Sequence, residues 1–136
     1  MDVTAALDFV REHHQAIMLT YRRDGSPQMS PVACNVDAGG AVVVSTRETA
    51  RKTVNLRRDP RVSLCVMTDG FYGAWIQVDG TAAVIGLSDA MEPLVEYYRT
   101  TAGEHPDWDD YRAAMVRDRR VIVRITVTRA GPDASG

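Results

Sequence analysis

The chain has 136 residues, a mass of 15.0 kDa and a formal net charge of −2, which predicts one domain large enough to bury a hydrophobic core. Its isoelectric point near 5.9 argues against nucleic acid as the main partner. No apolar run approaches the ~20 residues of a membrane span, and the first residues lack the pattern of a secretory signal. We therefore expect a cytoplasmic protein without a nucleic-acid or membrane partner.

The first part of the chain predicts a helix followed by two strands. The helix covers residues 4–13, with Thr4 as its cap and apolar side chains on one side. Residues 16–21 form the first strand, and the turn sequence Asp24-Gly25 leads into a second strand over residues 28–36.

Pro31 interrupts the hydrogen-bonding pattern of the second strand, because proline has no backbone N–H. The strand is therefore expected to lie at an edge of its sheet or to carry a bulge at this point. A plain edge strand and a ligand-facing irregularity both fit the sequence.

A third strand over residues 41–45 leads into a strongly cationic segment, residues 45–61. This segment holds six cations against two anions and includes Lys52, the only lysine of the chain. It predicts a short helix that ends before Pro60, with a capping box from Ser45 to Glu48. The free N–H groups at the start of such a helix, together with Lys52, can hold a phosphate. The alternative is a solvated helix whose arginines only keep the protein soluble.

The second half predicts three further strands and two helices. The strands cover residues 62–67, 72–85 and 121–127, and in the second of them Trp75 faces away from the apolar side. A helix with a capping box from Asp89 to Glu92 follows that strand, and a shorter helix covers residues 107–116.

Six strands joined mostly by hairpins predict a mainly β protein, a six-stranded antiparallel barrel with peripheral helices. We expect one domain over residues 1–130 and a flexible tail over residues 131–136.

The sequence offers no familiar catalytic or metal-binding constellation. Cys34 and Cys65 lie in apolar strands and do not form a CxxC pair, so we expect buried, reduced thiols and no metal site. His13 and His14 end the first helix, and His105 is expected to brace the residues after it. No nucleotide-binding glycine motif occurs. The lack of such motifs is expected when a cofactor carries out the chemistry.

Several strings resemble one known family in their joint order. They are Asp24-Gly25-Ser26-Pro27-Gln28, Lys52-Thr53-x-Asn55-Leu56-Arg57-Arg58-Asp59-Pro60-Arg61, Val78-Asp79-Gly80-Thr81-Ala82, Tyr98-Arg99-x-x-Ala102-Gly103-Glu104-His105-x-Asp107-Trp108-Asp109-Asp110-Tyr111-Arg112-x-Ala114-Met115 and Asp118-Arg119-Arg120-Val121. The chain resembles the FMN-binding-type split barrels of the pyridoxamine 5'-phosphate oxidase superfamily. Within that superfamily it is most similar to the actinobacterial branch that uses the deazaflavin coenzyme F420.

The resemblance implies a homodimer that binds coenzyme F420, with FMN as the alternative cofactor. The residues that it implies for the cofactor are Lys52 and Thr53 at the phosphate, Ser45 and Thr46 at the ring or ribityl chain, Ser30, Pro31 and Val32 along the ring, and Trp75 in a pocket shared across the dimer interface. Members of the branch often carry a second cation where this chain has Ala50. The neighbouring cation here, Arg51, is therefore a further candidate for cofactor binding, although its side chain leaves the helix about 100° away from that position.

The implied function is an F420-dependent reductase that transfers a hydride to a small unsaturated organic substrate. An FMN-dependent oxidase or flavin reductase and a non-catalytic F420 carrier are the alternatives. A nucleic-acid contact through the arginine-rich helix is disfavoured by the acidic balance of the chain.

Overall fold

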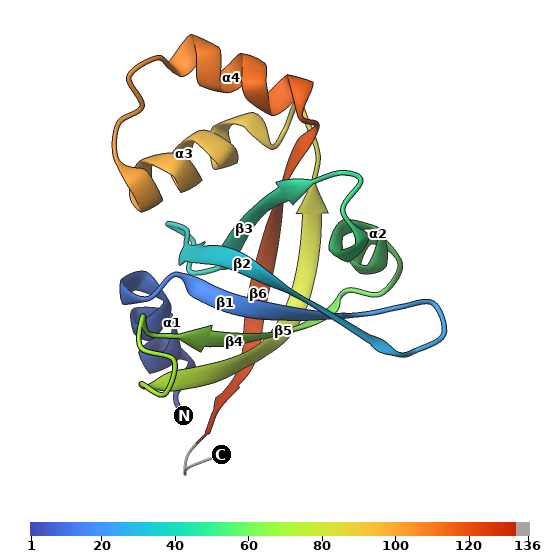
Figure 1. The fold of residues 1–136 in the computed structure, drawn as a ribbon, viewed down its shortest axis with the longest axis vertical. Coiled ribbons are helices and arrows are strands. Elements are labelled where there is room, and N and C mark those ends of the chain that lie inside the picture. Colours follow the sequence, from blue (N-terminus) through green and yellow to red (C-terminus); the bar gives the residue numbers. More distant parts are fainter. Residues whose placement is uncertain (133–136) are drawn as a thin grey trace.

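The structure is a computed structural model that describes residues 1–132. Its elements, in chain order, are α1 (Val3–Glu12), β1 (Gln15–Tyr21), β2 (Pro27–Val36), β3 (Val42–Arg47), α2 (Arg51–Arg58), β4 (Arg61–Met67), β5 (Trp75–Ile85), α3 (Met91–Ala102), α4 (Trp108–Arg117) and β6 (Arg120–Gly131). The six strands close into a barrel in the order β1-β2-β3-β6-β5-β4, and every neighbouring pair is antiparallel (Figure 1). The prediction of a mainly β, six-stranded antiparallel barrel with peripheral helices is confirmed.

The barrel interior is built by the period-two pattern of its strands. In β4, Val62, Leu64 and Val66 are almost fully buried, whereas the residues between them are only half-buried. Helix α1 adds Ala6 and Val10, both without exposed surface, to the same core. These apolar contacts hold the barrel closed.

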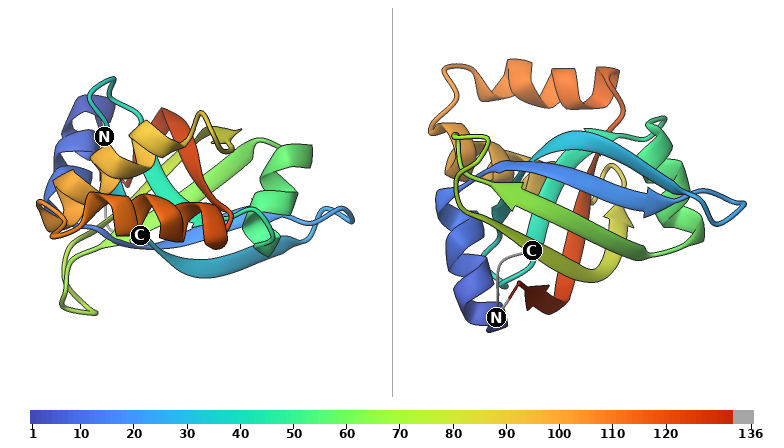
Figure 2. Two further views of the ribbon diagram at one scale, coloured as in Figure 1. Left: turned by 90° about the horizontal axis from the view of Figure 1, so that it is seen from above. Right: turned by 60° about the horizontal axis from the view of Figure 1, so that its bottom comes forward.

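A smaller core lies outside the barrel, beneath α3. It joins Val43 of β3 and Ile122 of β6 to Ala90 and Leu94 at the start of the α3 segment. Helix α4 lies beside α3 on the side away from the barrel (Figures 1 and 2). The pair therefore forms a separate layer over the outer face of β3 and β6.

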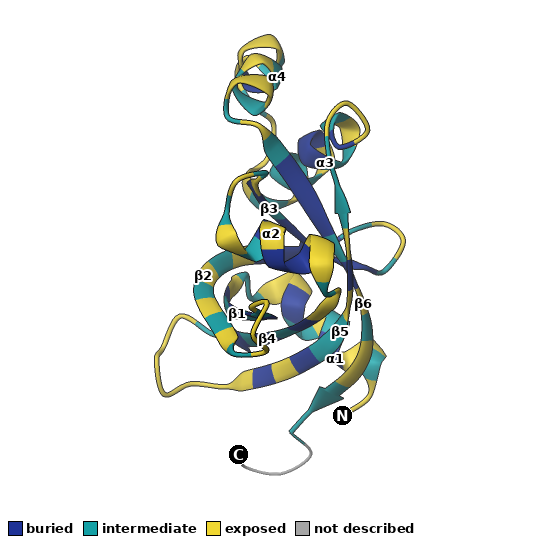
Figure 3. Ribbon diagram, turned by 90° about the vertical axis from the view of Figure 1, so that its right-hand side faces the viewer, coloured by how far each residue is buried: buried dark blue, intermediate teal, exposed yellow. Residues whose placement is uncertain are grey.

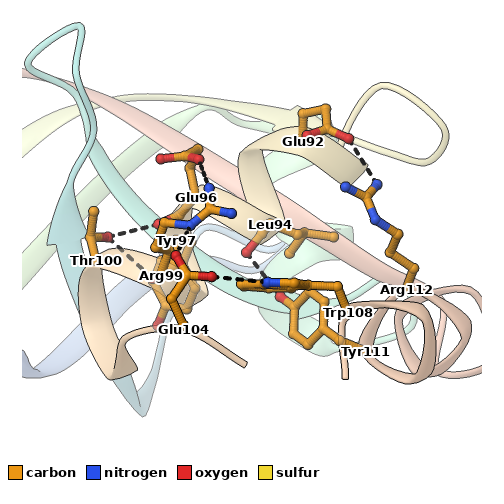
Figure 4. Close-up of polar contacts among 10 residues, drawn as sticks. All are labelled: Glu92, Leu94, Glu96, Tyr97, Arg99, Thr100, Glu104, Trp108, Tyr111 and Arg112. Carbon is orange, nitrogen blue, oxygen red and sulfur yellow. Dashed lines mark hydrogen bonds and ion pairs between the residues drawn. The ribbon is translucent and has the colours of Figure 1, made fainter. Parts of the chain in front are cut away.

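Polar contacts lock α3 to α4 and to the loop between them (Figure 4). The Tyr111 hydroxyl donates to the Leu94 carbonyl at 2.9 Å, and Arg112 pairs with Glu92 at 2.8 Å. In the loop, the His105 ring accepts a hydrogen bond from the Asp107 N–H at 2.9 Å. The expected bracing role of His105 is confirmed.

The helix caps differ from the sequence-based expectation. In α1 the cap is Asp2, whose carboxylate accepts from the Thr4 N–H at 2.7 Å, so Thr4 is not the cap. The caps of α2 and α3 are Ala50 and Ala90, without a side-chain bond, so both predicted capping boxes are wrong.

The failure of the first capping box has a clear cause. Ser45 stays in β3 because that strand pairs with β6 as far as Arg47, opposite Arg120. The backbone ladder of the sheet thus takes the residues that a longer α2 would have used. Ahead of α3, a turn satisfies the backbone instead, since the Ala90 N–H donates to the Gly86 carbonyl at 2.9 Å.

Three further boundaries complete the description. Strand β5 begins at Trp75, because the preceding residues form a turn in which the Gly73 N–H donates to the Gly70 carbonyl at 2.9 Å. Gly131 of the expected tail lies in β6, opposite Gln77, and residues 133–136 lie outside the described residues. None of the described helices is long and apolar enough to cross a membrane.

The two cysteines differ in their surroundings. Cys34 is fully buried in the barrel core, where burial raises the pKa of its thiol to about 12. Cys65 is half-buried and also free. The prediction of a buried, reduced thiol is therefore confirmed for Cys34 and only partly met at Cys65.

Strand β2 leaves part of one edge open. It pairs with β1 along residues 27–33, but its pairing with β3 covers only Cys34–Val36. The Cys34 N–H donates to the His14 carbonyl on the β1 side, so alternation directs the backbone of Ala33 and Pro31 to the open edge. The missing N–H of Pro31 therefore costs the ladder nothing, and the predicted edge position is confirmed.

Asp37 ties the turn between β2 and β3 to β6. Its carboxylate accepts from the N–H groups of Gly39 and Ala41 and from Arg124 Nε at 2.8 Å. Partial burial raises the pKa of Asp37, but the Arg124 bond and the turn N–H groups outweigh it and lower that pKa below its ordinary value. The charged form is thus favoured by the fold.

We expect Asp37→Asn to lower the free energy of unfolding by about 1 kcal/mol near neutral pH. Because the folded-state pKa of Asp37 is lowered, its contribution is present above the unfolded-state pKa and is lost as pH falls through the folded-state value. Urea unfolding from neutral pH to below about pH 4 should show the two proteins converging in acid. A difference that stays constant with pH would contradict the assignment.

Candidate functional site

The outer face of β3 and β6 ends at a cationic corner. In β3, Val44 and Thr46 are buried toward the barrel interior, so Ser45 and Arg47 face outward. In β6, Val121 is buried inward, and its neighbour Arg120 faces outward opposite Arg47. This corner receives the first turn of α2.

Two buried polar bonds fix how α2 sits on the barrel. The Thr53 hydroxyl donates to the Arg47 carbonyl at 2.6 Å, and Asn55 Nδ2 donates to the Thr20 hydroxyl at 3.1 Å. Thr53, Asn55 and Leu56 form the buried face of the helix, which Figure 3 shows against the barrel. Helix α2 lies between the diverging ends of β2 and β3 (Figure 1).

Lys52 reaches this corner without an anionic partner. Its ammonium makes no ion pair or hydrogen bond with any residue in the range 1–132. Burial lowers the pKa of Lys52, and the nearby Arg120 lowers it further. An anion placed here would relieve the repulsion between the two cations.

Backbone donors lie beside Lys52. The first hydrogen bond into α2 runs from the Val54 N–H to the Ala50 carbonyl at 3.1 Å. The N–H groups of Arg51, Lys52 and Thr53 therefore have no hydrogen-bond partner within the described chain. Three free donors and one ammonium group make this helix start suitable for a phosphate.

The structure places the remaining predicted site residues in two groups. Ser45 lies on the outer face of β3, and the backbone of Pro31 lies at the open edge of β2. Thr46 and Val32 contribute to the barrel interior, and the hydroxyl proton of Thr53 is engaged by the Arg47 carbonyl. Thr53 can therefore offer a ligand its N–H group and not its hydroxyl proton.

Ser30 carries an unsatisfied polar atom. It lies opposite Met18 of β1, which is buried in the barrel core. Its hydroxyl oxygen is buried and has no hydrogen-bond partner in the described chain. Because Ser30 shares the inward face of β2 with Val32, this hydroxyl points toward the barrel interior and not toward the outer face that carries Ser45.

Arg51 and Trp75 do not join the cationic corner. Arg51 lines a different groove of about 490 Å³, together with Arg22, Arg23 and Arg58. Trp75 begins β5, whose far end at Ile85 lies roughly 33 Å away along the strand and nearer to α2. Within one chain, Trp75 cannot reach Lys52.

Sequence reasoning missed Tyr97 of α3. Its hydroxyl donates to the Ala33 carbonyl at 3.0 Å, where the pairing of β2 with β3 stops. Burial raises the pKa of Tyr97, and the nearby Arg120 opposes that rise. Tyr97 thus ties α3 to β2 at the point where β2 separates from β3. Nothing in the amphipathic pattern of the helix distinguishes it from an ordinary core residue.

The corner and the open edge together can hold a flat polar ring with a phosphate-bearing chain. The free backbone groups of β2 can bond to ring heteroatoms, and Lys52 with the N–H groups of α2 can bond to a phosphate. No acid or base of a familiar catalytic constellation lies among these residues.

A closed antiparallel barrel with one strand edge left open is the architecture of the split barrels that bind flavin-type cofactors. The profile of the pyridoxamine 5'-phosphate oxidase family matches residues 3–131. The chain belongs to that family.

Individual relatives refine this assignment. An F420H(2)-dependent biliverdin reductase from Mycobacterium tuberculosis (strain CDC 1551 / Oshkosh) is 28% identical over 125 residues, which are 91% of this chain and 82% of the relative. A conserved hypothetical protein of Mycobacterium tuberculosis has a similar structure, with a TM-score of 0.76 and 25% identity over 100% of this chain and 92% of its own. A structure described as an F420 reductase gives a TM-score of 0.70 at 17% identity, over 91% and 94% of the two chains. The same fold also occurs in heme-binding proteins, so the fold alone does not identify the cofactor.

Proposed function

We propose that this protein is a coenzyme F420-dependent reductase that acts on a small unsaturated organic substrate. The observation that carries the proposal is the unpaired Lys52 at the start of α2, in a chain that also leaves an edge of β2 open and is similar to an F420H(2)-dependent reductase. When bound, the reduced deazaflavin supplies a hydride from its C5 carbon. The residues of the chain bind and orient it.

Each part of the site has one task. Lys52 and the free N–H groups of α2 bind the cofactor phosphate, which carries the opposite charge. The Pro31 carbonyl and the Ala33 N–H at the open edge bond to the polar edge of the ring, since the Ala33 carbonyl already accepts from Tyr97, and Ser45 lies beside them on the outer face. Thr46 and Thr53 support these contacts from the barrel side, since both are buried. Such positioning is how a protein assists cofactor chemistry.

A second copy of the chain would complete the pocket. Phe71 and Tyr72 are 80% and 97% exposed in the loop before β5, and Trp75 is 40% exposed at its start. Exposed aromatic side chains favour a protein interface. We therefore propose a homodimer in which Trp75 of one subunit lines the pocket whose Lys52 belongs to the other.

FMN is the second candidate cofactor. The chain belongs to the pyridoxamine 5'-phosphate oxidase family, and the sequence resemblance to that superfamily implies FMN as the alternative to F420. FMN also combines a flat polar ring with a phosphate, so the same corner and edge would bind it. A carrier that binds F420 without turnover is the third candidate, since the site offers no evident acid or base.

Titration of the purified protein with F420 and with FMN, followed by fluorescence, separates these candidates. We expect tighter binding of F420 and weaker binding as salt rises, because the contact is ionic. Reduced F420 should then be oxidised in the presence of enones, quinones or tetrapyrroles, and the absorbance of the oxidised coenzyme should appear. Tighter FMN binding would favour the oxidase. F420 binding without turnover on a broad substrate panel would favour the carrier.

Trp75→Ala is expected to lower the rate of turnover more than the affinity for the cofactor, because the side chain would wall the substrate slot and keep water out. Steady-state rates and cofactor titrations measure the two effects. Light scattering should report twice the chain mass for both proteins.

Subunit mixing tests whether the pocket is shared. A heterodimer of Lys52→Ala and Trp75→Ala chains contains one intact site only if the two residues come from different subunits. Recovery of activity on mixing is expected. If heterodimers form and activity is not recovered, the two residues do not meet in a pocket shared between subunits.

A further inference from the structure

Arg120 is the first residue of β6 and is not among the cofactor-binding residues predicted from the sequence. It lies directly opposite Arg47 in the ladder between β3 and β6. It is half-buried, and its guanidinium has no ion pair or hydrogen bond to any residue among 1–132. A half-buried arginine without a partner is unusual, because its five donors normally find acceptors.

The first turn of α2 reaches the same place. The Arg47 carbonyl accepts from the Thr53 hydroxyl at 2.6 Å and from the Ala50 N–H at 3.2 Å. These two bonds hold Lys52 next to the strand end that carries Arg120. The two groups interact, since Arg120 contributes to the lowered pKa of Lys52.

Arg51 is differently placed, although it is adjacent to Lys52 in sequence. It lines the groove of about 490 Å³ between α2 and the hairpin that joins β1 to β2. Arg120 instead borders a cavity of about 330 Å³ that includes Arg119 and Glu48, on the β6 side of α2. The two arginines thus lie on opposite sides of the helix start.

We propose that Arg120 is the second cation of the phosphate site, facing Lys52 across one bound phosphate group, and that Arg51 takes no part in it. The assignment rests on the proposed binding of a phosphate-bearing cofactor. A guanidinium group provides paired donors, and an ammonium group provides a point charge, so the two complement each other on one phosphate. Arg120 of β6 would thus supply the second positive charge that related proteins often carry at the position of Ala50.

A purely structural role for Arg120 is the competing explanation. Tyr97 and Tyr111 both lie near Arg120, which lowers the pKa of each against the larger effect of burial. Arg120 could therefore pack against α3 and α4 without touching a ligand. Such a role would change stability and leave phosphate recognition unaffected.

Ligand pairs that differ only in phosphate distinguish the two explanations. FMN and riboflavin form one pair, and F420 and its phosphate-free deazaflavin form the other. Arg120→Met should weaken binding of the phosphate-bearing member at least tenfold and leave the phosphate-free member unchanged. Arg51→Met, the matched control, should change neither. An equal loss for both members of a pair, or a larger effect from Arg51→Met, would overturn the proposal.

Lys52 provides a readout that does not depend on which cofactor is bound. Because it is the only lysine, reductive ¹³C-methylation gives one lysine signal, whose pH titration reports its pKa by NMR. Arg120→Met should raise that pKa and reduce the response of the signal to inorganic phosphate. An unchanged response to phosphate would refute the proposal even if F420 is the cofactor. A reduced response to inorganic phosphate would support it even if the reductase assignment fails.

Discussion

Lys52→Ala is expected to weaken binding of the phosphate-bearing cofactor by about 10- to 100-fold. Loss of one charge-assisted contact to a phosphate corresponds to roughly 1.5–3 kcal/mol, and each 1.4 kcal/mol is a factor of ten. The fold should be unaffected, because Lys52 makes no hydrogen bond or ion pair within residues 1–132 and lies beside another cation. The free energy of unfolding should stay the same or rise slightly as the repulsion is removed.

The comparison should include Arg51→Ala as a control on the same helix. Arg51 is exposed and lines the other groove, so its loss should change affinity much less. The lowered pKa of Lys52 adds a pH signature, because the ammonium is lost at a lower pH than an ordinary lysine. Wild-type affinity should therefore fall early on the alkaline side, and the variant should lack that step. Equal affinity of wild type and Lys52→Ala would return Lys52 to the role of a solvated surface cation.

Gly80→Ala is expected to cause the largest loss of stability, about 3 kcal/mol. An added Cβ would meet the Thr126 carbonyl oxygen at 2.2 Å and the Ile125 side chain at 3.0 Å. Gly80 lies at the irregularity in the pairing of β5 with β6, so the neighbouring backbone must move to make room. Two strands of the closed barrel would then lose part of their register.

Gly70→Ala is the matched control, because an added Cβ there meets nothing within 4 Å and its φ is not positive. Urea unfolding of both variants should show a large loss for Gly80→Ala and a change within about 0.5 kcal/mol for Gly70→Ala. Similar stability of the two variants would show that the strands absorb the added methyl group.

The sequence predicted those features that depend on local pattern. The alternation of Val62, Leu64 and Val66 defined a strand and its buried side, and Pro31 marked an edge. The predicted cap of α2 was wrong because Ser45 could serve either a helix start or a strand, and only the pairing of β3 with β6 decides between them. Local pattern does not contain that information.

The sequence also predicted only part of the candidate site, because local pattern does not show which distant residues the fold brings together. The cationic run drew attention to Lys52, but alternation within β3 sends Ser45 and Thr46 to opposite faces. Arg120 and Tyr97 are distant from Lys52 in sequence and reach the site through the register of β6 and the docking of α3. Trp75 lies far from Lys52 in one chain, and a single sequence does not reveal how two copies would meet.

The open edge of β2 also bears on how the protein avoids aggregation through strand addition. An exposed strand edge is a template on which another chain can add a strand, and repeated addition leads to aggregation. Pro31 offers no N–H at this edge, so an added strand would meet a gap in its hydrogen-bond ladder. One residue thus leaves the edge open and at the same time unsuited to a continuous intermolecular sheet.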